Sequence, residues 1–193
     1  MSYAGAENDR MIAVMLMDCV VAAVDTTASP PVVRVRAGEW TSAWVRWHSV
    51  AAGKARHWRV PSIGEQGKLL SPSGNPAMGT FIPGLYGNAG APPDNRDHVE
   101  VWRFDDGGSL VYDWNAKSYT IDLPAGTVTV KVGDSVLTMT PSSTRLVSSK
   151  INLVGEVTID GKTQINSTLN TVGDINSAGK IIDAGGNTPN HKH

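Results

Sequence analysis

Apolar and polar residues alternate in short runs over the first half of the chain, and glycine- and proline-containing breaks separate the runs. Alternation with a period of two is typical of half-buried β-strands. Before them, residues 8–17 predict one short helix with Asn8 as its cap. Five strand candidates joined by such short turns predict a small closed barrel. They are residues 18–25, 31–38, 40–49, 55–76 and 78–87.

All aromatic side chains, six Trp, four Tyr and two Phe, lie at or before Tyr119. The remaining residues, 120–193, are rich in Val, Ile and Thr with regularly placed Gly. Branched residues favour strands and are scarce in disordered segments. The second half is therefore expected to pack a narrow core of small side chains. The change of character falls after the Gly-, Pro- and Asn-rich residues 87–97.

The second half also carries hairpin signals and a repeat. The turn sequences "DDGG" at 105–108 and "NAK" at 115–117 separate alternating runs, so residues 99–124 predict a series of hairpins. Further along, "VGEVTIDGK" at 154–162 aligns with "VGDINSAGK" at 172–180, a spacing of 18. Short strand repeats punctuated by Gly indicate a β-helix or β-solenoid.

Each predicted strand of this region has only two or three small apolar residues, such as Val128, Val130 and Val132, or Val157 and Ile159. One ribbon of this kind cannot bury its apolar side alone. Three identical ribbons around a shared axis can, and their sheet edges then pair with neighbours. A monomeric β-sandwich is the alternative.

Charge and motifs narrow the possible functions. The net charge of −1 gives no general attraction to nucleic acid, and no apolar run is long enough for a transmembrane helix. The single cysteine, Cys19, excludes an internal disulfide; it is expected to be a buried thiol and fits assembly in a reducing cytoplasm. Neither nucleophile-elbow, P-loop nor zinc-protease motifs occur, so an enzyme is not expected.

Two features of the first half concern the barrel. Its bulky core is predicted to come from Trp40, Trp44, Trp47 and Trp58, some of which could instead face a neighbouring subunit. The same part of the sequence has more basic than acidic residues: Arg34, Arg36, Arg46, Lys54, Arg56 and Arg59. We expect these basic residues on a solvated face or at a subunit interface. The alternative is a ligand-binding face for single-stranded nucleic acid or sugar.

Residues 34–86 resemble the OB-fold domain of phage baseplate assembly protein V, the central spike family of contractile tails, which includes the spikes of R-type pyocins. The resemblance is most specific in "WRVPSIGEQG" at 58–67, followed by "LLSPSGN" and "GTFIPGLY". Gly67 departs from the branched residue common there, and it would weaken a strand interior or mark a bulge. The resemblance implies an OB barrel followed by a trimeric, intertwined β-helix.

The sequence ends in "HKH", which places His191 and His193 on the same side of an extended strand. Around a threefold axis, two histidines per chain give six imidazoles. Six nitrogen ligands suit iron, nickel or cobalt better than tetrahedral zinc. The resemblance implies iron, because these spikes carry a His-x-His motif at the tip that binds one iron ion. A disordered tail or a tag fragment is the alternative reading of this terminus.

The expected fold is therefore all-β, with an OB barrel and a trimeric β-helix that ends in a pointed, metal-closed apex. The expected segments are a helical docking segment (1–17), the OB domain (18–90), a linker (91–98), the shaft (99–182) and the apex (183–193).

The expected function is that of a contractile-tail spike, from a phage or an R-type pyocin. A homotrimeric needle would dock on tail tube or baseplate hub proteins and pierce the bacterial outer membrane, binding neither nucleic acid nor a small substrate. It would be made in the cytoplasm and would become part of the tail particle. The alternative is an OB module that binds oligonucleotide or glycan and is trimerised by a β-rich stalk.

Overall fold

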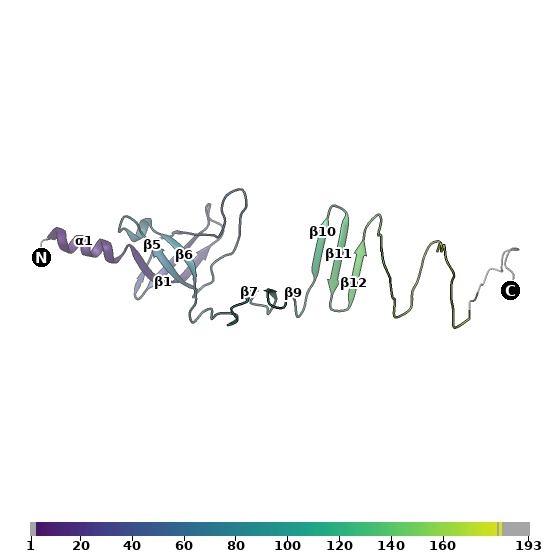
Figure 1. Cartoon of the computed structure of the whole chain (residues 1–193). Coiled ribbons are helices and arrows are strands. Elements are labelled where there is room, and N and C mark those ends of the chain that lie inside the picture. The colour runs from purple at the N-terminus through teal and green to yellow at the C-terminus, as the bar shows by residue number, and fades with distance from the viewer. Residues whose placement is uncertain (1–2, 181, 183–193) are drawn as a thin grey trace. The chain divides into compact units, whose positions relative to one another are not determined.

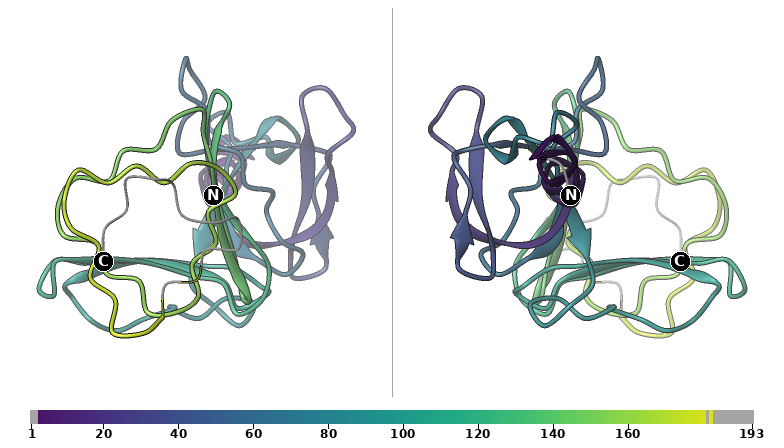
Figure 2. Two further views of the ribbon diagram at one scale, coloured as in Figure 1. Left: turned by 90° about the vertical axis from the view of Figure 1, so that its right-hand side faces the viewer. Right: turned by 90° about the vertical axis from the view of Figure 1, so that its left-hand side faces the viewer.

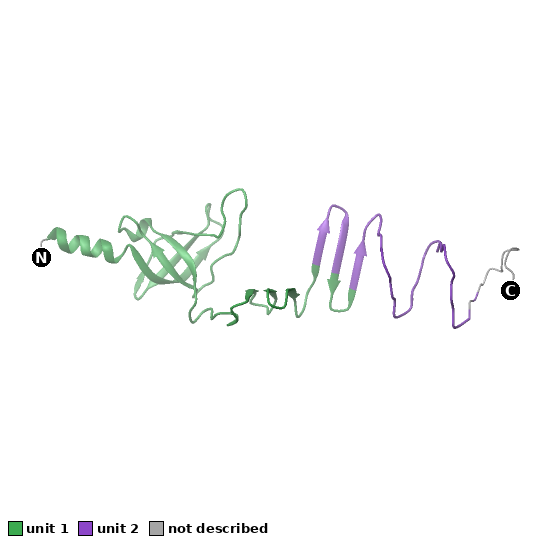
Figure 3. Ribbon diagram, viewed as in Figure 1, with its two compact units in different colours: residues 1–128, 139–143 green, residues 129–138, 144–193 purple. Residues whose placement is uncertain are grey.

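A computed structural model of the chain describes residues 3–180 and residue 182. The chain divides into two compact units (Figure 3). The first comprises residues 1–128 and 139–143, and the second comprises residues 129–138 and 144–193. The first unit contains the only α-helix of the described chain and a six-stranded sheet.

The amino-terminal helix α1 spans Tyr3–Ala13, so the prediction of a helix over 8–17 was wrong at both ends. The reason is that strand β1 (Leu16–Asp25) begins inside the predicted range and pairs with β5 (Gln66–Leu70) from its first residue. Sheet pairing therefore overrides the helical pattern there. None of the helices in the described part of the chain has the length and apolar character needed to span a membrane.

The six-stranded sheet has the order β3-β2-β1-β5-β6-β4 and curls into a barrel (Figure 1). The β4 end meets β2, because Val33 of β2 and Val45 next to β4 exchange backbone hydrogen bonds of 2.8 and 2.9 Å. The prediction of a closed barrel is therefore confirmed, and the closure covers a sheet edge that would otherwise be open. The remaining elements are β2 (Val32–Ala37), β3 (Trp40–Thr41), β4 (Arg46–Trp47), β6 (Thr80–Leu85) and the short 3-10 helix η1 (Pro76–Met78).

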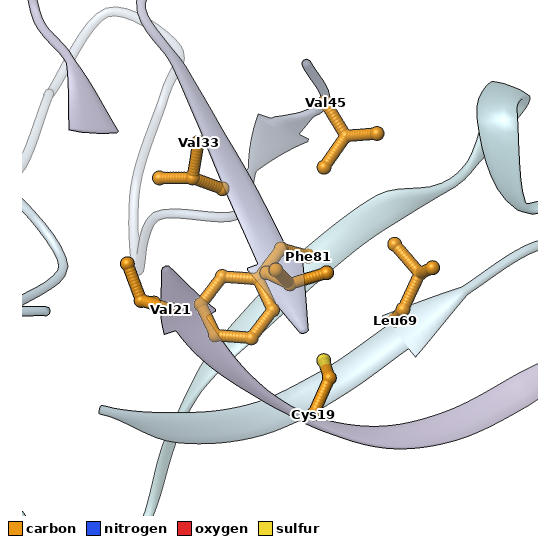
Figure 4. Packing of buried hydrophobic residues seen from close by; sticks show 7 residues of the cluster. Cys19, Val21, Val33, Val45, Leu69 and Phe81 are labelled. Atoms are coloured by element: carbon orange, nitrogen blue, oxygen red, sulfur yellow. The ribbon is translucent and has the colours of Figure 1, made fainter. Parts of the chain in front are cut away.

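The barrel core is aliphatic around one phenylalanine, and the prediction of a tryptophan core was wrong (Figure 4). Trp40, Trp44 and Trp58 are exposed, and only Trp47 packs against the core as a partly buried neighbour. Alternation along the strands explains the difference, because it directs small branched residues inward and leaves the narrow interior to one ring. The buried cluster is Cys19, Val21, Val33, Val35, Val45, Leu69 and Phe81.

Gly67 lies in β5 opposite β6, at the register shift between Gln66 and Gly67. A Cβ atom added to Gly67 would overlap the carbonyl oxygen of Ile82 and come within 2.5 Å of the Phe81 ring. The predicted bulge is therefore present, and the missing side chain lets the Phe81 ring fill the barrel.

The predicted hairpins form a separate three-stranded sheet in the order β7-β8-β9. Strands β7 (Val99–Arg103) and β8 (Ser109–Asp113) are joined across "DDGG", and β8 and β9 (Ser118–Asp122) across "NAK". The second connection is a four-residue loop, residues 114–117, and its last residue, Lys117, has a positive φ of 53°.

A further meander, β10-β11-β12, lies mostly in the second unit. Its strands are β10 (Val128–Val132), β11 (Ser135–Thr140) and β12 (Ser143–Val147). Beyond β12 the backbone winds without forming a strand through residue 180 (Figure 2). The strands expected there are absent from the single chain, as they would be if their pairing partners belonged to other chains.

Candidate functional site

Exposed aliphatic side chains recur along residues 120–182, and they are called the aliphatic row here. Val154 and Val172, which occupy equivalent positions of the 18-residue repeat, are 98% and 105% exposed. Leu153 is 70% and Ile182 83% exposed. Monomeric proteins rarely leave so much contiguous apolar surface in water. The described chain lacks anything that covers these side chains, so the row is a surface for association.

The backbone of the same region also requires partners. Strand β9 is an edge strand and all five of its residues are exposed, while β10 and β12 are the edges of the second meander. From residue 149 to 180 every residue is exposed and outside any strand. Backbone polar groups are normally paired, and open edges attract other strands. The unpaired backbone and the aliphatic row therefore indicate one interface between chains.

A charged network holds the linker of residues 91–98 against strand β8. The Arg96 guanidinium donates to Asp94 Oδ2 at 2.8 Å and to Asp113 Oδ2 at 3.1 Å. The hydrogen bond from Arg96 holds the pKa of Asp94 well below its usual range. Asp113 has a lowered pKa because it accepts the Ala116 N–H, and the charges of His98 and Arg96 lower it further.

The basic residues of the barrel do not converge on one point. Arg34 lies over the Trp44 ring at 4.8 Å. Arg36 donates to the carbonyl of Gly38, and Arg59 is paired with Glu65 at 2.6 Å. Burial opposes ionisation of Glu65, but hydrogen bonds from Arg59 and the Ser62 N–H outweigh it and lower the pKa. Part of the predicted basic surplus is thus used in local contacts.

Three of the five histidines lie within the described residues, and two lie outside them. His48 lies within hydrogen-bond distance of Thr80, and His57 meets Trp102 edge-on. No group of three or more potential metal ligands occurs within residues 3–180. The predicted metal ligands His191 and His193 lie outside the described residues.

Comparison with known proteins identifies both halves. Residues 17–86 match the family described as "type VI secretion system/phage-baseplate injector OB domain". Residues 100–177 match the Gp138 β-helical trimerization domain. The chain thus combines a baseplate-type OB domain with a β-helical trimerization domain, and the trimerization domain supports a homotrimer.

The chain is also similar over most of its length to a phage spike protein. It is 27% identical over 186 residues to the spike protein of Escherichia phage P2, and the match covers 88% of this chain and 83% of that protein. The resemblance seen in the sequence is confirmed, and the exposed aliphatic row lies largely inside the matched trimerization domain.

Sequence reasoning missed two features of the first unit. One is the network around Arg96, whose partners Asp94 and Asp113 are far apart in the sequence and are brought together only by the fold. The other is a cleft between the barrel and β7, described below. The aromatic residues that line this cleft were visible, but the pattern gave no indication that they share a surface.

Proposed function

We propose that this protein is the central spike of a contractile tail, of a phage or an R-type pyocin. Three copies form a needle that caps the tube or baseplate and pierces the bacterial outer membrane when the tail contracts. The needle works through rigidity and needs no catalysis, since main-chain ladders between copies resist bending. The observation that carries the proposal is the succession of an injector OB domain and a trimerization domain whose aliphatic residues are uncovered in one chain.

The amino-terminal segment is proposed to dock onto tube or hub proteins. Helix α1 contains no buried residue, and Tyr3 and Ile12 are 89% and 66% exposed. A helix this short is unstable in water without a surface to pack on. The tube or hub would supply that surface, and the assembled protein would be a component of the tail particle.

The apex is proposed to be closed by one iron ion per trimer, bound by His191 and His193 of each chain. The donor chemistry fits, because three chains contribute six imidazole nitrogens and no open coordination position is left for catalysis. When bound, the metal links three carboxyl-terminal ends that would otherwise fray. Gly185 and Gly186 permit a sharp turn before this motif.

Metal analysis of the purified protein tests the apex directly. Elemental mass spectrometry is expected to find one iron per three chains. The double variant His191→Ala/His193→Ala should lose it, whereas Lys192→Ala, the matched control between the two ligands, should retain it. Iron-free wild-type protein, or equal iron in both variants, would contradict the proposed apex.

A second candidate is an OB module that binds single-stranded nucleic acid or glycan. One observation favours it: Arg34 lies over the exposed Trp44, near the exposed Trp40, a combination used by OB folds to stack bases. Salt-dependent binding of single-stranded DNA that disappears in Trp44→Ala would support this function. Absence of binding at low salt would exclude nucleic acid as its ligand.

A further inference from the structure

A cleft with a volume of about 960 Å³ lies in the first unit. It is named here the collar cleft. One wall comes from the barrel and the chain that leaves it, within residues 59–66 and 84–93, and the other from residues 101–105 of β7 and its end. A cleft of this size has room for several side chains.

The lining of the collar cleft includes both aromatic and charged side chains. Tyr86 is 66% exposed, and Trp102 and Phe104 are about half exposed. The Arg59–Glu65 ion pair lies at the barrel wall. Aromatic side chains gathered in a concave surface and edged by charge are characteristic of binding sites between macromolecules.

The occupant follows from where the cleft lies along the chain. Residues 101–105 fall inside the matched trimerization domain, which begins at residue 100. Strand β7 is also an edge of its sheet, paired only with β8 within the described chain. The collar cleft is therefore continuous with the interface at which copies of this chain meet. A tube or hub protein has no comparable connection to this surface.

We propose that a second copy of the chain fills the collar cleft in the trimer. This inference rests on the proposed trimeric spike and adds that the barrels take part in the interface as well as the shaft. Each copy would then contact its neighbour at the junction of barrel and shaft. Force applied to the barrel collar would pass into the shaft through packed aromatic side chains.

Site-specific photo-crosslinking in the full chain tests this contact. The photoreactive residue p-benzoylphenylalanine replaces Tyr86, which conserves an aromatic ring in the cleft. Val50, 89% exposed and outside the cleft lining, is the control position. Chains labelled with heavy nitrogen are co-refolded with unlabelled chains, so that mass spectrometry distinguishes crosslinks between copies from those within one copy.

The expected result is efficient crosslinking between copies from position 86, at least tenfold above position 50. Crosslinks confined to one copy, or a yield equal to that at position 50, would overturn the inference. Sedimentation of the same samples separates the two failures. A trimer without crosslinks between copies contradicts only the filled cleft, whereas a monomer contradicts the trimeric spike as well.

A second measurement keeps the test independent of the photoreactive residue. Ala91→Cys places a thiol in the cleft, and Ala55→Cys places one at an exposed position outside it. If a neighbour fills the cleft, maleimide should modify position 91 at least tenfold more slowly than position 55 in the native protein. Equal rates in a sedimenting trimer would overturn the inference.

Discussion

Gly67 offers a sharp test of how the barrel is packed, through the substitution Gly67→Ala. The added methyl group would overlap the Ile82 carbonyl oxygen and come within 2.5 and 2.7 Å of two Phe81 ring carbons. A backbone carbonyl in a paired strand cannot move away easily, and the Phe81 ring is fully buried. Overpacking of this kind typically costs about 1–3 kcal/mol of folding free energy.

The assay uses the distribution of tryptophan. All six Trp residues lie between positions 40 and 114, within the first unit, so tryptophan fluorescence reports on that unit and is blind to residues 120–193, which contain no aromatic side chain. With a urea dependence of about 1–3 kcal/mol per molar, the cost predicts a midpoint lower by roughly 1 M.

The matched control is Gly53→Ala, because a Cβ there meets nothing within 4 Å. It should change the midpoint little or raise it slightly, since replacing Gly by Ala reduces the entropy of the unfolded chain. If Gly67→Ala and Gly53→Ala unfold at the same urea concentration, the account of the Phe81 packing around Gly67 is wrong.

Three further predictions concern other parts of the chain. Ile159→Asp should weaken or abolish the trimer in sedimentation. The control Thr158→Asp, on the opposite face of the predicted strand, should leave the trimer intact. Equal effects of the two substitutions would refute the proposed axial core. Burial raises the pKa of Cys19 to about 11, so iodoacetamide at pH 8 should modify it only after denaturation, and rapid reaction in the native state would contradict its burial. The lowered pKa values of Asp94 and Asp113 stabilise the linker above the unfolded pKa of about 4, and this stabilisation is lost as the pH falls through the lower folded values. Arg96→Ala should therefore lower the melting temperature by more at pH 7 than at pH 2, and an equal difference at the two pH values would refute the linkage.

Local signals predicted the hairpins well. The turns at 105–108 and 115–117 carry their own conformational preferences, so β7, β8 and β9 lie where the sequence indicates. Gly67 was predicted to weaken a strand interior or to mark a bulge, and it lies next to a register shift whose extra residue, Gly84, is in the partner strand β6.

Non-local packing explains the errors. The helix predicted over 8–17 is present but ends earlier, at Ala13, because residues 16–20 pair with β5, some 46–54 positions away. A tryptophan core was predicted from the large size of the Trp side chains. The inward positions of β2 are instead occupied by Val33 and Val35, and Phe81 fills the space that remains. The strands expected beyond β12 have no partners within the described part of one chain, so only the repeat in the sequence indicates them.

Sedimentation equilibrium of the purified, full-length protein tests the central claim, that the chain becomes a complete structure only when three copies share an axis. The account predicts a single species with three times the 20.5 kDa chain mass, unchanged over a hundredfold range of concentration. A stable species at the mass of one chain would contradict it.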